Sequence, residues 1–406
     1  MSKIKLLAVV PDSHGVGKYR IMDPYKFIGD NYNNEIHVDI THNAENKDEF
    51  FKDYNIVVFH TFIHQSTHQE NLERIKWLKD KGIKVIMDID DLWFVDSRHP
   101  MNHQIRIGKI GEKKVEFLKL ADYVTTTTSI FQSTLIERLK LKNVLVFPNA
   151  IDPNEKQFQP NPIKSEKIRF GWLGGSSHLH DINLLTNGIS STFWSNQQKV
   201  QFVLCGFDTR GHFTEMNKDT GEIKQVPIQP KQTVWYEYEK IFTDNFKMVD
   251  PEYFNYLETF TKSDFNDSNK SYVRKWTENI STYANNYNYF DVSLSPLVES
   301  VFNSNKSQLK IIEAGFHKKA VIASNVKPYT IDLISAYDNG KFIDNGNALL
   351  VEPNKNHKQW QKHMKKLVEN PEMIKDLGER LYDTVKYTYS QQKVCKDRVE
   401  FLKSII

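Results

Sequence analysis

The sequence predicts an α/β protein of two doubly wound domains, each a parallel sheet with helices on both faces. Short apolar runs alternate with helix-like stretches in both halves of the chain, which is typical of strands joined by helical crossovers. A proline-rich segment separates the two alternations, and 406 residues suffice for two or three domains. Ligands of such sheets bind beyond the carboxyl ends of the strands, so we expect an interdomain cleft with site residues just after strands.

The first domain, residues 1–155, is predicted from apolar runs that have the length of buried strands. They lie at 4–10, 56–60, 84–88, 123–127 and 144–147. Pro11 ends the first run, and a lysine-rich helix with Gly82 as its C-cap precedes the third.

The second domain follows a segment, residues 152–167, that holds three prolines and little apolar material. We predict an interdomain linker over 156–167 and a second domain over 168–385. Its strands are expected at 168–173, 200–205, 290–294, 320–323 and 348–351. Trp360, Met364, Leu367 and Val368 form the apolar stripe of an amphipathic helix. Residues 386–406 predict a C-terminal helix, with a return to the first domain as one possible path.

An aromatic-rich stretch interrupts the second alternation. Residues 207–290 hold 18 of the 50 Phe, Tyr and Trp residues of the chain, and their interior shows no repeat. The stretch is too long for a loop, so we predict an insertion over about 207–280 with its own small core. Aromatic faces also bind sugar rings, but packing of the rings is the simpler interpretation.

Composition narrows the class of protein. A net charge of +3 gives no general case for nucleic-acid binding, and 39% hydrophobic with 26% charged residues suits a globular chain. Cys205 and Cys395 are too few for a disulfide framework or a zinc cluster. The apolar run at the start is too short for a signal peptide or a membrane span. We predict a cytoplasmic protein. Lysines 358, 362, 365 and 366 suit either a solvated helix face or peripheral contact with the inner membrane face.

A glycine turn follows the first strand, with Gly15 and Gly17 before Lys18. A phosphate-binding Walker loop fails here because Asp12 and Tyr19 stand at required Gly and Ser/Thr positions. A dinucleotide fingerprint fails because Arg20 replaces its last glycine. The remaining prediction is a turn whose backbone N–H groups meet an anion, or an ordinary strand-to-helix turn.

Three carboxylates, Asp88, Asp90 and Asp91, follow the strand at 84–88. Clustered like charges cost free energy, which favours a function over packing. Asp88 and Asp90 fit the start of a magnesium-dependent haloacid-dehalogenase motif, and they also fit acceptors for sugar hydroxyls. Helix capping and surface charge are the structural alternative.

Two further segments follow strands of the second domain. Gly174 and Gly175 allow close approach of backbone to a ligand, and His178 can donate to phosphate or sugar; a zinc pair with His180 lacks a third ligand. In residues 296–316, a helix starting near Ser307 places Lys310 and Glu313 one turn apart. Lys306 and the helix start suit a diphosphate, and Glu313 suits ribose hydroxyls. A surface Lys–Glu pair is the simpler alternative.

With these residues assembled, the chain resembles the retaining GT-B glycosyltransferases of family 4, or group 1. The segment FNSNKSQLKIIEAGFHKKAVIASNVKPY is similar to the donor-binding segment of that family, and VLVFPNAIDP is similar to the segment that ends its first domain. GWLGGSSHLHD resembles the glycine turn of its donor domain, and DIDDLW stands where many members carry a His-Asp near the transferred sugar.

The resemblance implies two Rossmann-like domains and transfer of a sugar from a nucleotide-sugar donor to a glycan, lipid-linked or protein acceptor. Retention, no metal and no cofactor are expected. Glu313 would hold the nucleotide ribose, and Asp90 would contact the sugar. The Arg and Lys pair of the family is missing, so Lys306 and Lys310 would take the diphosphate charge. Asn305 stands where the family has an acid, and with Ser307 it is expected at the donor.

Two other functions stay open at this point. One is a non-catalytic carbohydrate- or nucleotide-binding protein of the same fold. The other is a haloacid-dehalogenase-like phosphatase that uses Asp88, Asp90 and Mg²⁺.

Overall fold

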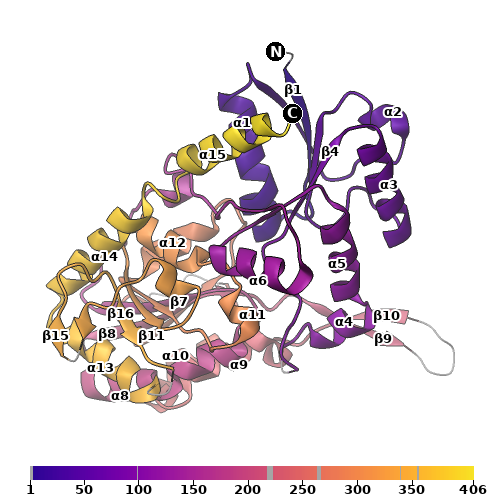
Figure 1. The fold of residues 1–406 in the computed structure, drawn as a ribbon. Helices are drawn as coiled ribbons and strands as arrows, with labels where there is room; N and C mark the ends of the chain where they lie inside the picture. The colour runs from indigo at the N-terminus through magenta and orange to yellow at the C-terminus, as the bar shows by residue number, and fades with distance from the viewer. Residues whose placement is uncertain (1–2, 98, 217–222, 263–266, 339, 354–355) are drawn as a thin grey trace. The chain divides into compact units, whose positions relative to one another are not determined.

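A computed structural model describes residues 3–97, 99–216, 223–262, 267–338, 340–353 and 356–406 (Figure 1). The chain divides into two compact units. Unit 1 comprises Met1–Glu155, Glu299–Ile312 and Thr384–Ile406, and unit 2 comprises Lys156–Val298 and Glu313–Asp383. These boundaries differ from the predicted ones at 156–167, which belong to unit 2, and at 299–312, which belong to unit 1.

Among the described residues of unit 1, six parallel strands form one sheet in the order β2-β1-β3-β4-β5-β6. The strands are β1 (Ile4–Val9), β2 (Ile36–Thr41), β3 (Ile56–Phe59), β4 (Lys84–Asp88), β5 (Tyr123–Thr126) and β6 (Val144–Val146). Strand β2 was not predicted. It is an edge strand with one fully buried residue, so it carries no continuous apolar run.

Both faces of this sheet are covered, as expected for a doubly wound domain. Alternate residues of β1 enter two separate cores: Leu6 and Ala8 enter one, and Leu7 and Val9 the other. The helical elements of unit 1 are the π-helix Gly17–Met22, α1 (Asp23–Asn31), α2 (Asp48–Phe51), α3 (His68–Asp80), α4 (Asn102–Ile107), α5 (Ile110–Leu120), α6 (Ser129–Leu139), α11 (Val301–Ser304) and α15 (Gln391–Ser404).

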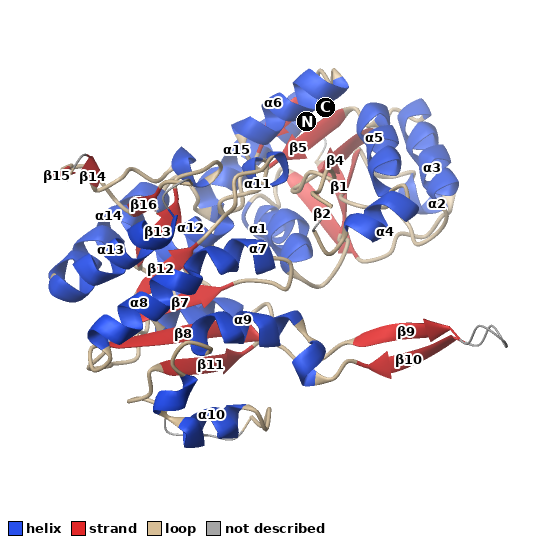
Figure 2. Cartoon of the chain, turned by 90° about the horizontal axis from the view of Figure 1, so that it is seen from below, coloured by secondary structure: helices blue, strands red, loops and turns tan. Residues whose placement is uncertain are grey.

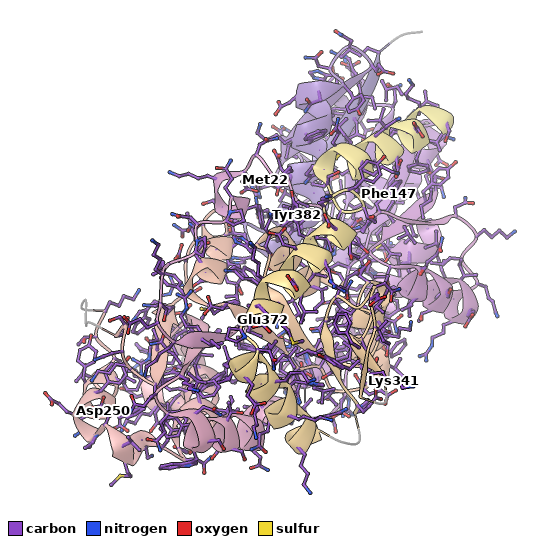
Figure 3. The ribbon with its side chains drawn as sticks, turned by 90° about the vertical axis from the view of Figure 1, so that its left-hand side faces the viewer. Met22, Phe147, Asp250, Lys341, Glu372 and Tyr382 are labelled. Carbon is purple, nitrogen blue, oxygen red and sulfur yellow. The ribbon has the colours of Figure 1, made fainter. Side chains whose placement is uncertain are left out.

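The C-terminal helix α15 is part of unit 1, and Figure 1 shows it in yellow beside α1. Its Cys395, Val399 and Leu402 pack into the same core as Leu6 and Ala8. The Phe401 ring lies 5.7 Å from the ring of Phe147, which Figure 3 labels near this helix. The last residues of the chain therefore complete a core that the first strand begins.

Among the described residues of unit 2, a second sheet of six parallel strands has the order β11-β8-β7-β12-β13-β16. The strands are β7 (Ile168–Leu173), β8 (Val200–Phe207), β11 (Tyr272–Trp276), β12 (Val292–Ser295), β13 (Ala320–Ser324) and β16 (Leu349–Val351). Its helices are α7 (Leu179–Ile182), α8 (Thr186–Asn196), α9 (Val234–Thr243), α10 (Pro251–Leu257) and α13 (Asn356–Glu369). Helices α12 (Leu309–Phe316) and α14 (Glu372–Val385) cross the unit boundaries.

The expectation of a separate small core for the predicted insertion is wrong: its described residues form no core of their own. Trp235, Tyr238, Phe246 and Tyr272 join the main core of unit 2, because β11 extends the sheet and α9 packs against it. The hairpin of β9 (His212–Met216) and β10 (Ile223–Pro227) projects from this body in Figure 2. Residues 217–222 and 263–266 of the predicted insertion lie outside the described residues.

The predicted amphipathic helix is α13. Trp360, Met364 and Leu367 are fully buried, and Lys358, Lys362 and Lys365 are exposed. Among the helices that the structure describes, none is long and apolar enough to cross a membrane.

Candidate functional site

The carboxyl edge of the unit 1 sheet gathers polar residues from distant parts of the chain, and Asp88 is the most buried of them. Arg20 donates to both of its carboxylate oxygens, Nε to Oδ1 at 2.9 Å and Nη2 to Oδ2 at 2.7 Å. The Thr125 hydroxyl donates to Oδ2 at 2.6 Å. Asp88 is 0% exposed, so it stabilises the fold and is inaccessible as a phosphatase nucleophile. This geometry argues against the haloacid-dehalogenase interpretation.

Arg20 links this ion pair to the segment after β6. Its Nη1 donates to the Phe147 carbonyl at 2.7 Å and to Asn149 Oδ1 at 3.1 Å. The Asn149 amide in turn donates to Ser307 Oγ at 2.8 Å. The chain of contacts fixes Ser307, a predicted donor residue, within unit 1.

Asp90 is paired with His60, a residue that the sequence analysis left without a role. His60 Nε2 lies 2.9 Å from Asp90 Oδ1, and its Nδ1 lies 3.0 Å from Thr61 Oγ1. The side chain of Asp90 is 18% exposed and that of His60 is 6% exposed. The signal for His60 was its place directly after β3, at the same sheet edge as Asp90.

Electrostatics separates the two neighbouring carboxyls. Burial alone would raise the pKa of Asp90, but the hydrogen bond and charge of His60, with Lys114 and Arg20, hold that pKa well below its usual range. Burial and the charge of Asp90 raise the pKa of Asp91, against the opposing charges of Lys306 and Lys114. Asp90 is therefore a stable anion beside a carboxyl that accepts a proton more readily.

The turn between α11 and α12 holds Asn305, Lys306 and Ser307. The Asn305 amide donates to the Val301 carbonyl at 2.7 Å, while its Oδ1 is buried with no hydrogen-bond partner among the described residues. Lys306 Nζ lies 4.7 Å from the centroid of the Phe302 ring. Lys310 and Glu313 both lie within α12, at the predicted helical spacing.

The glycine turn after β1 binds a carboxylate of the chain itself, as the simpler of its two predicted interpretations allows. The N–H groups of His14 and Gly17 donate to Asp12 Oδ1 at 2.8 and 3.2 Å, so a carboxylate of the chain itself takes the place expected for a ligand anion. A Cβ on Gly17 would lie 1.9 Å from the Asp12 carbonyl oxygen, which requires glycine there. Open space surrounds Gly15. Lys18 forms ion pairs with Asp23 and Glu155, each at 2.8 Å.

In unit 2, the loop after β7 carries Gly174, Gly175 and His178. Tyr238, from helix α9 of the predicted insertion, holds this loop: its hydroxyl accepts from the His178 N–H at 2.8 Å and donates to the Gly175 carbonyl at 3.2 Å. His178 Nδ1 lies 2.7 Å from Asp181 Oδ2. Open space around a Cβ at Gly175 leaves room for a ligand. The insertion thus shapes the glycine loop.

Glu313 is 3% exposed and has a buried tyrosine beside it. The Tyr287 hydroxyl donates to Glu313 Oε2 at 3.2 Å. Burial, with the charge of Glu313, raises the pKa of Tyr287, which keeps the hydroxyl protonated as a donor. The Tyr287 ring stacks on His317 with centroids 5.0 Å apart. Tyr287 therefore orients one oxygen of this carboxylate.

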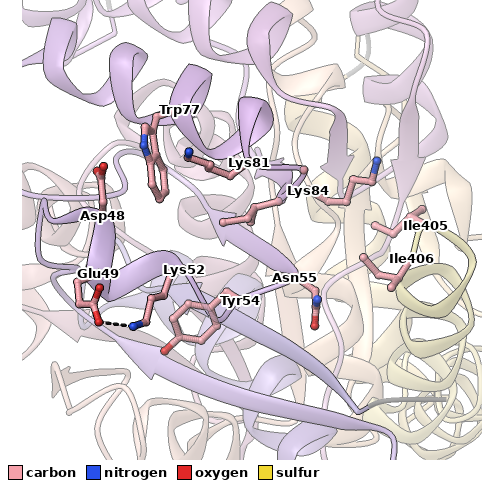
Figure 4. A pocket seen from close by; sticks show the side chains of 12 residues that line it. Asp48, Glu49, Lys52, Tyr54, Asn55, Trp77, Lys81, Lys84, Ile405 and Ile406 are labelled. Carbon is pink, nitrogen blue, oxygen red and sulfur yellow. Dashed lines mark hydrogen bonds and ion pairs between the residues drawn. The ribbon is translucent and has the colours of Figure 1, made fainter.

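A second region of unit 1 is hollowed at the amino ends of β3 and β4 (Figure 4). This cavity of ≈ 730 Å³ is lined by Trp77, Lys81 and Asn55, among others. It lies at the sheet edge opposite to Asp90, and ligands of doubly wound sheets bind at the carboxyl edge. We do not assign it to the site. In the described part of the chain, no group of three or more His, Cys, Asp or Glu residues is arranged to hold a metal ion.

No family model matches this chain, and no curated protein matches its sequence. Solved structures match its fold. HepE from Anabaena, crystallised with UDP and glucose, is 11% identical with a TM-score of 0.59, over 99% of both chains. This chain has the GT-B fold.

Two other solved structures share this fold. TarM of S. aureus is 14% identical with a TM-score of 0.54, over 88% of this chain and 55% of TarM. The trehalose-6-phosphate synthase OtsA is 10% identical with a TM-score of 0.50, over 87% of this chain and 73% of OtsA. At these identities the likeness concerns the fold, and the chemistry has to be argued from the side chains.

Proposed function

We propose that this protein is a glycosyltransferase that moves a sugar from a nucleotide-sugar donor to a hydroxyl of an acceptor. The observation that carries the proposal is the buried Glu313 carboxylate, held by Tyr287 on a helix of a GT-B fold. A carboxylate fixed in this way suits the vicinal hydroxyls of a ribose, because each hydroxyl donates one hydrogen bond. HepE, which shares the fold, has been crystallised with UDP and with UDP-glucose.

His60 and Asp90 are proposed to contact the reacting sugar or the acceptor hydroxyl. Asp88 is explained by the ion pair with Arg20, whereas the partly exposed, ionised Asp90 is not needed by the sheet. An anion at this position accepts hydrogen bonds from sugar hydroxyls and stabilises positive charge that develops on the sugar ring.

Lys306 and Lys310 are proposed to stabilise the leaving diphosphate. Lys306 lies in the turn that carries the unpartnered Oδ1 of Asn305, and Lys310 lies in the first turn of the helix that follows it. Transfer with retention and without a metal follows from the resemblance in sequence and is part of the proposal. Lys310→Ala is expected to lower kcat at least tenfold, and Lys358→Ala on the exposed face of α13 is the control. Equal activity of the two variants would refute the phosphate assignment.

The first test is calorimetric binding of UDP, GDP, ADP and CDP, with and without EDTA. We expect one nucleotide to bind without a metal and Glu313→Gln to weaken it at least tenfold. Glu372→Gln, an exposed glutamate in the first turn of α14, is the matched control. No nucleotide binding, or binding indifferent to Glu313, would overturn the proposal.

A non-catalytic binding protein is separated from an enzyme by turnover. Wild type is incubated with the bound nucleotide's sugar donors and a panel of acceptors, and release of the nucleoside diphosphate is measured. The enzyme releases it, and Asp90→Asn lowers the rate at unchanged nucleotide affinity. Binding with no release under any acceptor would favour the non-catalytic alternative.

Peripheral membrane contact is a separate part of the proposal. Lys358, Lys362 and Lys365 lie on the exposed face of α13, which suits anionic lipid headgroups. Co-sedimentation with phosphatidylserine vesicles should fall when these three lysines are replaced by glutamine. Unchanged sedimentation would leave them as a solvated face.

A further inference from the structure

Unit 1 contains an apolar pocket beside the carboxyl edge of its sheet. Its volume is ≈ 580 Å³, within the range of small-molecule sites. Trp93, Phe94 and Val95 form one side of the pocket, Ile105 comes from α4, and Val115 comes from α5. Asn102, Arg106, Glu112 and Glu116 are its polar and charged lining residues. Most of the surface that a ligand would meet is therefore hydrocarbon.

The segments that line the pocket follow the carboxylates of the candidate site in the sequence. Trp93 comes three residues after Asp90, and α4 and α5 follow before the next strand. The segments that line the pocket thus begin where β4 ends, at the edge that carries His60 and Asp90. Lys114 of α5 is next to Val115. Its charge acts to lower the pKa of Asp90 and also that of Asp91, so α5 lies within electrostatic reach of both carboxyls.

Local packing shapes the pocket and leaves an aromatic side chain open. A Cβ on Gly111 would lie 2.5 Å from the Trp93 ring, so the glycine lets the indole pack closely against α5. The Phe94 ring lies 5.5 Å from that of Trp93 and is 51% exposed. Exposure of a large apolar ring costs free energy in water, and a bound apolar group would recover it.

We infer that this pocket binds the alkyl chain of an amphipathic acceptor, whose hydroxyl-bearing end faces Asp90. The inference rests on the proposed function and narrows its acceptor from any hydroxyl compound to a lipid-type molecule. An alkyl chain suits the Val95, Ile105 and Val115 surfaces better than a glycan, because hydroxyls placed against these side chains would lose water without gaining partners.

The test compares binding of octyl β-D-glucoside, below its micelle concentration, with that of methyl β-D-glucoside. The two share a head group and differ only in the chain. Calorimetry on the full chain without nucleotide should show the octyl compound binding at least tenfold more tightly, since each buried methylene adds to the affinity. Ile105→Asp should abolish the difference. Ile107→Asp is the matched control, because Ile107 lies on the same helix, is 71% exposed and is absent from the pocket lining.

Val115→Asp, from α5, provides a second variant, and the thermal unfolding of each variant reports whether it folds. Equal affinity for the two glucosides, or loss of octyl binding in Ile107→Asp alone, would overturn the inference. If a nucleotide binds and the octyl chain does not, the pocket inference fails while the transferase stands. If the octyl chain binds and no nucleotide does, the proposed function fails and the acceptor assignment fails with it.

Discussion

Replacement of Asp88 by alanine should destabilise the protein severely, although Asp88 is not proposed to contact the donor or the acceptor. Asp88 is 0% exposed and Arg20 is 1% exposed, and two hydrogen bonds join them. Removal of the carboxylate leaves the Arg20 charge buried with the Phe147 carbonyl and Asn149 as its remaining acceptors. Breaking a buried ion pair costs about 3–5 kcal/mol. We expect the free energy of unfolding to fall by about that amount.

Urea denaturation followed by circular dichroism measures the loss. Asp30→Ala is the control, because its ion pair with Lys26 is more than half exposed on both sides and should contribute roughly 0–1 kcal/mol. The double variant Arg20→Met with Asp88→Leu removes both charges and should recover most of the stability lost in Asp88→Leu alone.

A loss below about 1 kcal/mol in Asp88→Ala would refute the reasoning, since a buried charge without its partner cannot be that stable. So would a double variant less stable than Asp88→Leu. If instead Asp88→Ala keeps its stability but loses transferase activity, Asp88 takes part in the chemistry, contrary to its assignment as a structural residue.

Three further predictions follow from buried groups. Tyr287→Phe should weaken nucleoside diphosphate binding about fivefold and reduce the preference for a ribonucleotide over a 2′-deoxyribonucleotide. Tyr289→Phe is the control and should change neither quantity. Equal loss of binding in both variants would contradict the role of Tyr287 in orienting Glu313. Burial lowers the pKa of Lys319 from 10.5 to about 8, so the unfolded chain binds more protons between these values and stability should rise with pH there. Lys319→Met should remove this rise of stability with pH, and it should raise the free energy of unfolding at pH 7 by roughly 1–3 kcal/mol. A steeper dependence of stability on pH in the variant would contradict the assignment to Lys319. Burial raises the pKa of Cys395 to about 12 and also raises that of Cys205, so iodoacetamide should label neither thiol until urea unfolds the chain, as mass spectrometry would show.

The aromatic insertion illustrates how sequence and structure complement each other. The aromatic composition identified a segment that departs from the alternation of strands and helices, but it did not indicate the structural role of that segment. Tyr238 enters the main core and holds the backbone at Gly175 and His178. The contact joins residues 60 or more positions apart, and no local pattern indicates such a pair.

The fold class and most of the strands and helices could be predicted from the sequence alone. Strands such as β1 and β8 are apolar on both faces, and α13 carries a stripe at helical spacing, because burial imposes a local period on each element. Two of the strands that were not predicted, β2 and β11, lie at edges of the two large sheets, where partial exposure relaxes that pattern. The resemblance then extended the prediction to the GT-B fold, which the solved structures share.

The partners of the candidate residues could be identified only in the folded chain. Asp88 and Asp90 are two residues apart, and the sequence pattern does not distinguish them. In the structure, Asp88 is buried in an ion pair with Arg20, whereas Asp90 is hydrogen-bonded to His60. Gly17 proved to accommodate Asp12, and Glu313 proved to be held by Tyr287. For Asp88, Asp90 and Glu313, hydrogen bonding depends on side chains that the fold brings together from 26 to 68 positions away, and these distances in sequence leave no local trace.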